Sequence, residues 1–249
     1  MAKFVPLTGC QKELWLSAKA ALSDYAETSI RGCYHIDALL DPELLRQAIR
    51  CTLHFTPLPA ASLCQDEEEP CFMVGEPHEP DFRVLDAASQ PDSVAAADRM
   101  IDEFFEEPVE NPLIRYALVL TGPSTCIVAI KCSHVVLDGL AIFFHIAVIA
   151  NVYTALARGE TPNLGEPCPC DEAYIEDQAH CASPRFQKDM AFWQEHLARL
   201  PEKRLLRALP GRPDVLGESR HQKYVLSEKA SREAAALIAA HKVSPAVFF

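Results

Sequence analysis

The stretch that decides the fold is Ser133-His134-Val135-Val136-Leu137-Asp138-Gly139. An apolar segment typical of a strand precedes it at residues 127–130, and an apolar segment typical of a helix follows it at residues 140–156. A strand that turns into a helix in this way presents one imidazole, that of His134, at the end of the strand. We expect Asp138 to hold the turn through the first amides of the helix, and Gly139 to let the backbone enter the helix closely.

Composition and charge exclude several classes of function. The chain has 249 residues, of which 49% are hydrophobic and 23% are charged, as in ordinary globular proteins. Its net charge of -12 argues against a nucleic-acid-binding surface. The apolar run at residues 137–150 is interrupted by Asp138 and His145, so it is shorter than the roughly 18 residues of a membrane span. We therefore expect no nucleic-acid partner and no membrane.

The cysteines and the N-terminus indicate a cytoplasmic protein. Ten cysteines would predict disulfides in a short secreted chain, but this chain is long and its first residues show no apolar signal-peptide region. Several of the cysteines lie within apolar segments, among them Cys126 and Cys132. We interpret them as reduced packing residues.

Periodicity predicts a mixed succession of helices and strands. Helices are expected at residues 9–22, from Asp41-Pro42 onward, after a cap at Asp92 or Ser93, at 186–200, and after a cap at Ser227. Strands are expected at 30–36, 72–74 and 224–226, and the segments 114–120 and 126–132 flank a hairpin turn. Residues 161–184 are predicted to be a linker rich in proline and cysteine.

The decisive stretch resembles the His-His-x-x-x-Asp-Gly signature of the condensation domains of nonribosomal peptide synthetases. These domains belong to the superfamily of chloramphenicol-acetyltransferase-like acyltransferases. Weaker motifs occur in the order that the family shows, namely Gln11 with Trp15, then Pro112-Leu113-Ile114-Arg115, then Tyr174 with Asp177, then Phe192-Trp193. The resemblance implies an α/β fold, with a mixed sheet flanked by helices in one lobe of a chloramphenicol-acetyltransferase-like domain.

Two features depart from the family pattern. Ser133 stands where the family usually has its first histidine, and residues 50–61 lack the later arginine of the family's second motif. That arginine is thought to pair with the signature aspartate, so we expect another partner for Asp138. The motifs of the second lobe would lie beyond Phe249, and Ser244-Pro245 starts a helix only a few residues before it. We therefore expect residues 1–175 to form the first lobe and 176–249 the crossover and the start of a truncated second lobe.

The resemblance assigns the chemistry to His134. An unperturbed histidine suits proton transfer near neutral pH, and acyl transfer from a thioester to an amine needs the nucleophile positioned and its proton accepted. The resemblance places His134 in a tunnel that phosphopantetheine arms of carrier proteins enter from both faces, with no cofactor bound directly. Asp138, Gly139 and Ser133 are expected to be structural residues of this site. An adenylation domain is the expected neighbour.

Other residues deserve simpler interpretations. His145 follows the signature within the apolar helix and is expected to lie in the core or to line the tunnel. Ser133 could be a nucleophile beside His134, but adjacent strand residues point to opposite faces. Cys132 could share the face of His134, but no other residue supports a thiolate mechanism. The cluster formed by Cys168, Cys170, His180 and Cys181 matches no common zinc spacing, so we expect no metal site.

Condensation between carrier-bound thioesters is therefore the predicted reaction, and this chain is expected to be an incomplete and inactive fragment. One alternative is a superfamily acyltransferase that uses acyl-CoA and a free alcohol or amine. Another is a non-catalytic docking module, which the Ser133 variant leaves open. We further expect the chain to self-associate through the apolar surface that a second lobe would cover.

Overall fold

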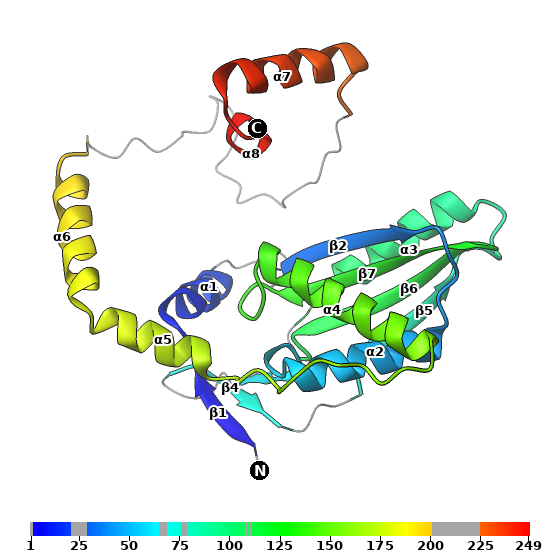
Figure 1. Cartoon of the computed structure of the whole chain (residues 1–249), viewed down its shortest axis with the longest axis horizontal. Helices are drawn as coiled ribbons and strands as arrows, with labels where there is room; N and C mark the ends of the chain where they lie inside the picture. Colours follow the sequence, from blue (N-terminus) through cyan, green and yellow to red (C-terminus); the bar gives the residue numbers. More distant parts are fainter. Residues whose placement is uncertain are drawn as a thin grey trace. The chain divides into compact units, whose positions relative to one another are not determined.

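The structure is a computed structural model that describes residues 2–20, 29–64, 69–75, 79–107, 109, 111–200 and 225–249 (Figure 1). Contacts divide the chain into two compact units, Met1–Leu205 and Leu206–Phe249. The first unit contains the sheets and most of the helices. The second contains α7 (Glu228–His241) and the short α8 (Pro245–Phe248). The division into lobes at residue 175 stays a prediction.

A four-stranded mixed sheet forms the centre of the first unit, with the strand order β2-β7-β6-β5. It consists of β2 (Ser29–Ile36), β5 (Phe82–Asp86), β6 (Ile114–Gly122) and β7 (Thr125–Ser133). The predicted hairpin is confirmed, because β6 and β7 pair antiparallel around a turn at residues 123–124. β5 pairs with β6 in parallel, and the helix α3 (Ser93–Glu106) connects them.

Helices cover both faces of this sheet (Figure 1). The helices α2 (Pro42–Phe55) and α4 (Gly139–Ala157) pack on one face over Tyr116, Leu118 and Ile130, whereas α3 packs on the other over Ala117 and Ala129. Alternate side chains of β6 and β7 thus enter different cores, which explains the apolar runs at residues 116–120 and 126–130. The predicted α/β fold with a mixed sheet flanked by helices is confirmed.

A second, smaller sheet packs against the signature turn through Val135. It has the order β1-β4-β3, with β1 (Lys3–Pro6), β3 (Ser62–Cys64) and β4 (Cys71–Val74) all antiparallel. Leu7, Phe72 and Leu113 form its core together with Trp15 of α1 (Gly9–Ala20) and Val135 of the signature. The strands β1, β3 and β5 had no clear signal in the sequence, because each is short and β3 and β5 adjoin Pro- and acid-rich segments.

The predicted helix starts correspond to side chains that cap them. Asp41 accepts hydrogen bonds from the amides of Glu43 and Leu44 at 2.8 and 3.1 Å, and Asp92 accepts one from Ala95 at 3.1 Å. Ser227 caps α7 in the same way. After the C-terminal end of α4, Gly159 has a φ of 70°, as expected of a glycine that ends a helix.

Three details of the sequence-based assignment were wrong. The predicted linker at 161–184 contains the helix α5 (Glu172–Cys181), which begins without a side-chain cap and buries none of its residues, so periodicity could not reveal it. Val94 stands at helical spacing with Ala97 and Ile101, which predicts a position in the core, but its side chain is 71% exposed. Val225 and Leu226 are not in a strand, while Tyr224 of that prediction lies outside the described residues.

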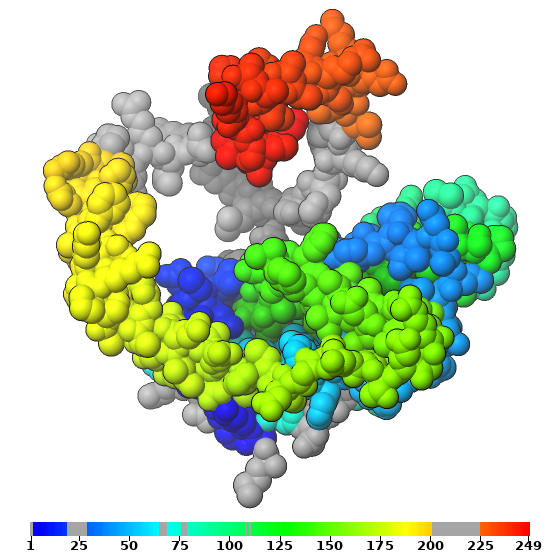
Figure 2. Space-filling model, viewed as in Figure 1, coloured from blue at the N-terminus to red at the C-terminus, as the bar shows by residue number. Residues whose placement is uncertain are grey.

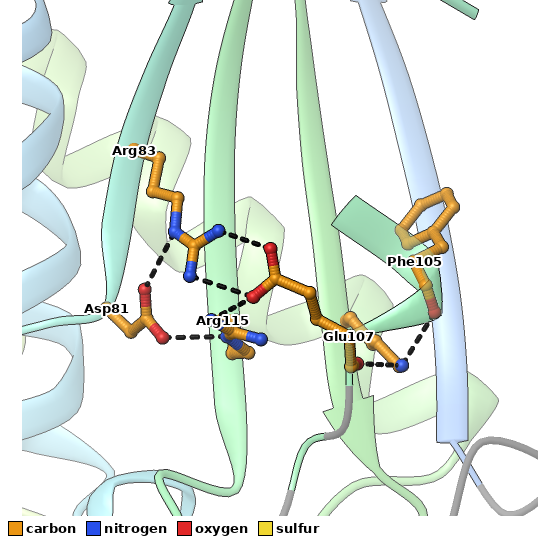
Figure 3. A network of polar contacts seen from close by, with 6 residues as sticks. Asp81, Arg83, Phe105, Glu107 and Arg115 are labelled. Carbon is orange, nitrogen blue, oxygen red and sulfur yellow. Dashed lines mark hydrogen bonds and ion pairs between the residues drawn. The ribbon is translucent and has the colours of Figure 1, made fainter. Parts of the chain in front are cut away.

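A network of charges joins β5, β6 and the end of α3 (Figure 3). Arg115 contacts Asp81 at 2.7 Å and Glu107 at 2.8 Å, and Arg83 contacts the same two carboxylates. Beside it, the buried Lys131 donates to the carbonyl oxygens of Phe105 and Glu107. Burial lowers the pKa of Lys131 to about 8, and its hydrogen bonds to two carbonyl groups show that it anchors the end of α3 to β7.

One helix of the described residues, α4, is long and apolar enough to cross a membrane by length and composition. The sequence did not predict a helix of this kind, because His145 and Asn151 interrupt its apolar residues. Its inner side packs on α2 and the sheet through Ile142, Ile149 and Val152. Length and composition alone are weak evidence for a membrane span.

Candidate active site

The signature forms a tight turn at the end of β7, and Ser133 holds it. The amide of Ser133 donates to the carbonyl of Leu113 at 2.8 Å, and its own carbonyl accepts from the amide of Val136 at 3.2 Å. Its hydroxyl accepts from the amide of Val135 at 3.4 Å. The buried Ser133 therefore uses its backbone and its side chain within the turn, as expected of a structural residue.

His134 projects from this turn between two buried neighbours. Ser133 is 5% exposed and Val135 is 3% exposed, so the backbone on both sides of His134 is anchored. The ring is half-buried, and no group of the described residues bonds to its buried Nδ1. Desolvating a polar nitrogen without a partner is costly, which makes this atom a candidate for a functional interaction.

Helix α1 docks onto the turn through Gln11. The Gln11 side chain donates from Nε2 to the carbonyl oxygen of Val135 at 2.9 Å, and its Oε1 accepts from the amide of Thr8 at 2.9 Å. The Thr8 hydroxyl in turn accepts from the Gln11 amide at 3.3 Å, so the two residues form a capping box. The spacing Thr-x-x-Gln could have revealed this cap in the sequence, but not the contact with Val135.

A further motif residue, Asp177, contacts the start of α1. Asp177 of α5 accepts a hydrogen bond from the Gly9 amide at 3.1 Å. Asp171, the residue just before α5, forms an ion pair with Lys3 of β1 at 2.8 Å. The segment that follows α4 is thus bound back to the N-terminal strand and helix.

Asp138 caps α4, as expected. Its Oδ1 accepts from the amide of Ala141 at 2.7 Å, and its backbone is extended before the helix begins. No arginine of the described residues forms an ion pair with it, and Arg50 instead contacts Glu79 at 3.2 Å. The carboxylate therefore has a backbone amide as its partner, which agrees with the missing arginine of the second motif.

Gly139 was expected to allow a close approach of the backbone at the start of α4, and this expectation was wrong. A Cβ atom at this position would meet nothing within 4 Å, and the residue does not have a positive φ. Among the described residues, no close approach therefore requires a glycine at the start of α4.

His145 is buried and pairs with a tyrosine that the sequence analysis missed. Its Nε2 lies 2.7 Å from the hydroxyl of Tyr116 on β6, and the two rings stack 6.0 Å apart. Burial lowers the pKa of His145 to about 4 and raises that of Tyr116 well above its usual value, so both are neutral near pH 7. Tyr116 was detectable as the hydroxyl-bearing residue of the apolar run at residues 116–120 of β6.

His145 also lines an apolar cavity of about 400 Å³. The walls come from the end of α2, the 3-10 turn η2 (Leu58–Ala60), the first half of α4 and residues 168–170. Figure 2 shows cyan atoms from the region of η2 in the hollow between α4 and the chain that leads into α5. Val136 and Leu137 of the signature line the cavity, but His134 does not.

The other candidate nucleophiles and ligands are not arranged for chemistry. Burial raises the pKa of the Cys132 thiol to about 12, so this residue stays protonated. Within the described residues no three His, Cys, Asp or Glu side chains are grouped to hold a metal ion. Cys168 and Cys181, two members of the suspected cluster, are exposed thiols.

A family model described as the condensation domain matches residues 1–245. The chain belongs to the condensation-domain family. This condensation-domain chain is 26% identical over 208 residues to surfactin synthase subunit 1 of Bacillus subtilis, which covers 80% of the chain and 6% of the synthase. It is 25% identical over 207 residues to enterobactin synthase component F of Shigella flexneri, covering 81% of the chain and 16% of that protein. It thus spans a small part of these relatives.

Solved condensation domains share its fold. The starter condensation domain of rhizomide synthetase RzmA superposes with a TM-score of 0.70 at 23% identity, covering 82% of this chain and 52% of that one. The first condensation domain of the CDA synthetase superposes with a TM-score of 0.68 at 24% identity, covering 80% and 52%. The chain therefore spans about half of each of these structures.

Proposed function

We propose that this condensation-domain chain contributes the histidine-bearing half of an active site that forms an amide bond between two thioester-bound substrates. The observation that carries the proposal is His134, which the signature turn holds at the end of β7 with its Nδ1 bonded to no described residue. Membership of the family supports the class of reaction.

In this reaction the amine of the acceptor attacks the thioester carbonyl of the donor. The carbon–sulfur bond breaks, the amide bond forms, the donor thiol leaves, and one proton passes from the amine to the thiol. His134 would orient the amine and accept its proton in transit. A thioester is already activated, so positioning supplies a large part of the rate.

The substrates would be carried on the phosphopantetheine arms of carrier proteins, and an adenylation domain would supply the activated amino acid. This arrangement belongs to a cytoplasmic assembly, as the sequence predicts. It also separates the proposal from the acyl-CoA alternative, in which the donor is a soluble thioester and the acceptor is a free amine or alcohol.

The test replaces His134 with alanine in the complete protein that the gene encodes. Amide formation between loaded carrier proteins should fall by roughly 10²–10⁴-fold, as expected when an acid–base group is lost. The melting temperature should change little, because the His134 ring is bonded to no described residue through Nδ1.

The matched control is His35→Ala, because His35 is an exposed histidine on β2. It should leave both the rate and the melting temperature unchanged. A wild-type rate in the His134→Ala protein would refute the catalytic assignment. Product formed only from acyl-CoA would favour the superfamily alternative, and no product from the wild type with either donor would favour a docking module.

A further inference from the structure

Two cysteines face each other across the edge of the small sheet. In the antiparallel pair of β3 and β4, Cys64 is the direct partner of Cys71, next to the pair formed by Leu63 and Phe72. Directly opposed residues of an antiparallel pair project from the same face of the sheet. Leu63 and Phe72 enter the core on one face, so Cys64 and Cys71 share the opposite face.

The register brings the two thiols within reach of a disulfide. Opposed Cα atoms in antiparallel strands lie about 4.5–5.5 Å apart. Disulfides span Cα separations of about 4.4–6.8 Å, so the register of this pair is compatible with a disulfide. Both residues are thiols in the structure and both are partly exposed, which leaves them accessible to a small oxidant.

The remaining cysteines have no such arrangement. In the large sheet Cys33, Cys126 and Cys132 are paired in register with Ala129, Ile36 and Ile30, none of which is a cysteine. Cys126 and Cys132 are also buried, and burial raises the pKa of both thiols. Among residues in described strands, Cys64 and Cys71 thus form the one cysteine pair in direct register.

We propose that Cys64 and Cys71 form a reversible disulfide that clips β3 to β4. With oxidised glutathione as the oxidant, one thiolate attacks the glutathione disulfide, forms a mixed disulfide and releases one glutathione. The second thiol then attacks the mixed disulfide, closes the Cys64–Cys71 bond and releases the second glutathione. Two thiols are oxidised, one glutathione disulfide is reduced to two thiols, and no other reactant is needed.

The Cys64–Cys71 disulfide would lie in the sheet that packs against the signature turn. β3 is an edge strand, held in the sheet on one side only by β4. Leu63 of β3 and Phe72 of β4 pack in the same core cluster as Val135, the residue after His134. Joining the two strands would therefore stiffen the sheet on which the signature turn rests. A partly exposed cross-strand disulfide is expected to be labile, as in redox-responsive pairs rather than structural ones.

The experiment oxidises the native chain with oxidised glutathione, blocks the remaining thiols and digests the product with a protease that cleaves after glutamate. Glu67, Glu68 and Glu69 lie between the two cysteines, so their peptides separate unless a disulfide joins them. We expect the joined peptides, with the loss of two hydrogen atoms, at a yield at least about tenfold higher from native than from denatured protein. The melting temperature should rise by roughly 3–8 °C and return on reduction.

Cys71→Ser should abolish the joined peptides and leave glutathione on Cys64, whereas the matched variant Cys33→Ser should leave the joined peptides unchanged. Cys64→Ser, on the edge strand, replaces Cys71→Ser if that variant does not fold. Glutathione retained on Cys64 of the native wild type without closure would overturn the proposal. Equal yields from native and denatured protein would also overturn it, because the fold would then not position the pair.

Discussion

At the scale of single residues, the pair of Tyr116 and His145 shows how burial sets the proton positions. Both side chains are neutral, and the described residues offer the Tyr116 hydroxyl no other partner. The hydroxyl hydrogen is satisfied only when it is donated to Nε2 of His145, which places the imidazole proton on Nδ1. His145 therefore acts as an uncharged link between β6 and α4 beside the apolar cavity.

This pair predicts a loss of stability in mild acid. The pKa of His145 is about 4 in the folded protein and about 6.5 when unfolded, so the unfolded state binds more protons between these values. The free energy of unfolding is therefore unaffected by protonation of His145 above pH 6.5. It decreases as the pH falls from 6.5 to 4, by roughly 3 kcal/mol in total. Denaturant unfolding of wild type and His145→Gln at several pH values measures it. The difference between the two should shrink in acid, and a constant difference would contradict the assignment.

A second prediction at this scale concerns the cap of α4. Asp138→Ala removes the acceptor for the Ala141 amide and should destabilise the protein by about 1 kcal/mol, or roughly 2–4 °C in melting temperature. Asp138→Asn keeps an oxygen acceptor and serves as the matched control. In the complete protein, we expect the rate of the proposed condensation to fall together with stability in the alanine variant. Lost turnover at an unchanged melting temperature would instead indicate a direct catalytic role.

At the scale of secondary-structure elements, the signature turn is held from three directions. The carbonyl of Leu113, the residue before β6, accepts from the Ser133 amide, Asp138 caps the start of α4, and α1 donates to the Val135 carbonyl through Gln11. Val135 also packs into the core of the small sheet. The orientation of His134 thus depends on elements that lie more than 100 residues apart in the sequence.

The contact between α1 and the signature turn depends on one side chain, that of Gln11, so a single substitution removes it. Gln11→Ala deletes the hydrogen bonds to the Val135 carbonyl and from the Thr8 amide, and should cost about 1 kcal/mol of stability. In the complete protein, the proposed turnover should decrease as well, because the turn that carries His134 loses one of its supports. Thermal unfolding and the condensation assay measure the two effects. Gln47→Ala, at an exposed site on α2, is the control, and an equal effect of both variants would refute the role of Gln11.

At the scale of the whole molecule, apolar side chains remain exposed on the first unit. Leu140, Phe143 and Phe144 on the outer side of α4 are 67%, 68% and 64% exposed. Figure 2 shows α4 on the surface toward the viewer. Three large apolar residues at helical spacing form a contiguous strip, which is unusual for a surface that stays in water.

We predict that the 249-residue chain self-associates through this strip. Light scattering should show a mass that increases with protein concentration, and Phe143→Glu should reduce the association by burying a charge in the contact. The matched control Val94→Glu alters an exposed apolar residue of α3, on the opposite face of the sheet. A strictly monomeric wild type, or equal effects of both variants, would exclude the strip of α4 as the contact.

Much of the fold could be predicted from local patterns. The hairpin of β6 and β7, the caps Asp41, Asp92 and Ser227, and the glycine after α4 depend on neighbouring residues, so a short window contains their cause. The short strands β1, β3 and β5 could not be predicted, because they exist through pairing with distant partners.

The candidate site divides in the same way. By itself, the sequence determined the signature, the position of His134 after a strand and the cap by Asp138, because these lie within seven consecutive residues. Only the tertiary structure decided that Gln11 supports Val135, that Tyr116 bonds to His145 and that Cys64 faces Cys71. The physical reason is that each of these contacts depends on strand register and helix packing, which are set by the burial of apolar side chains across the whole unit.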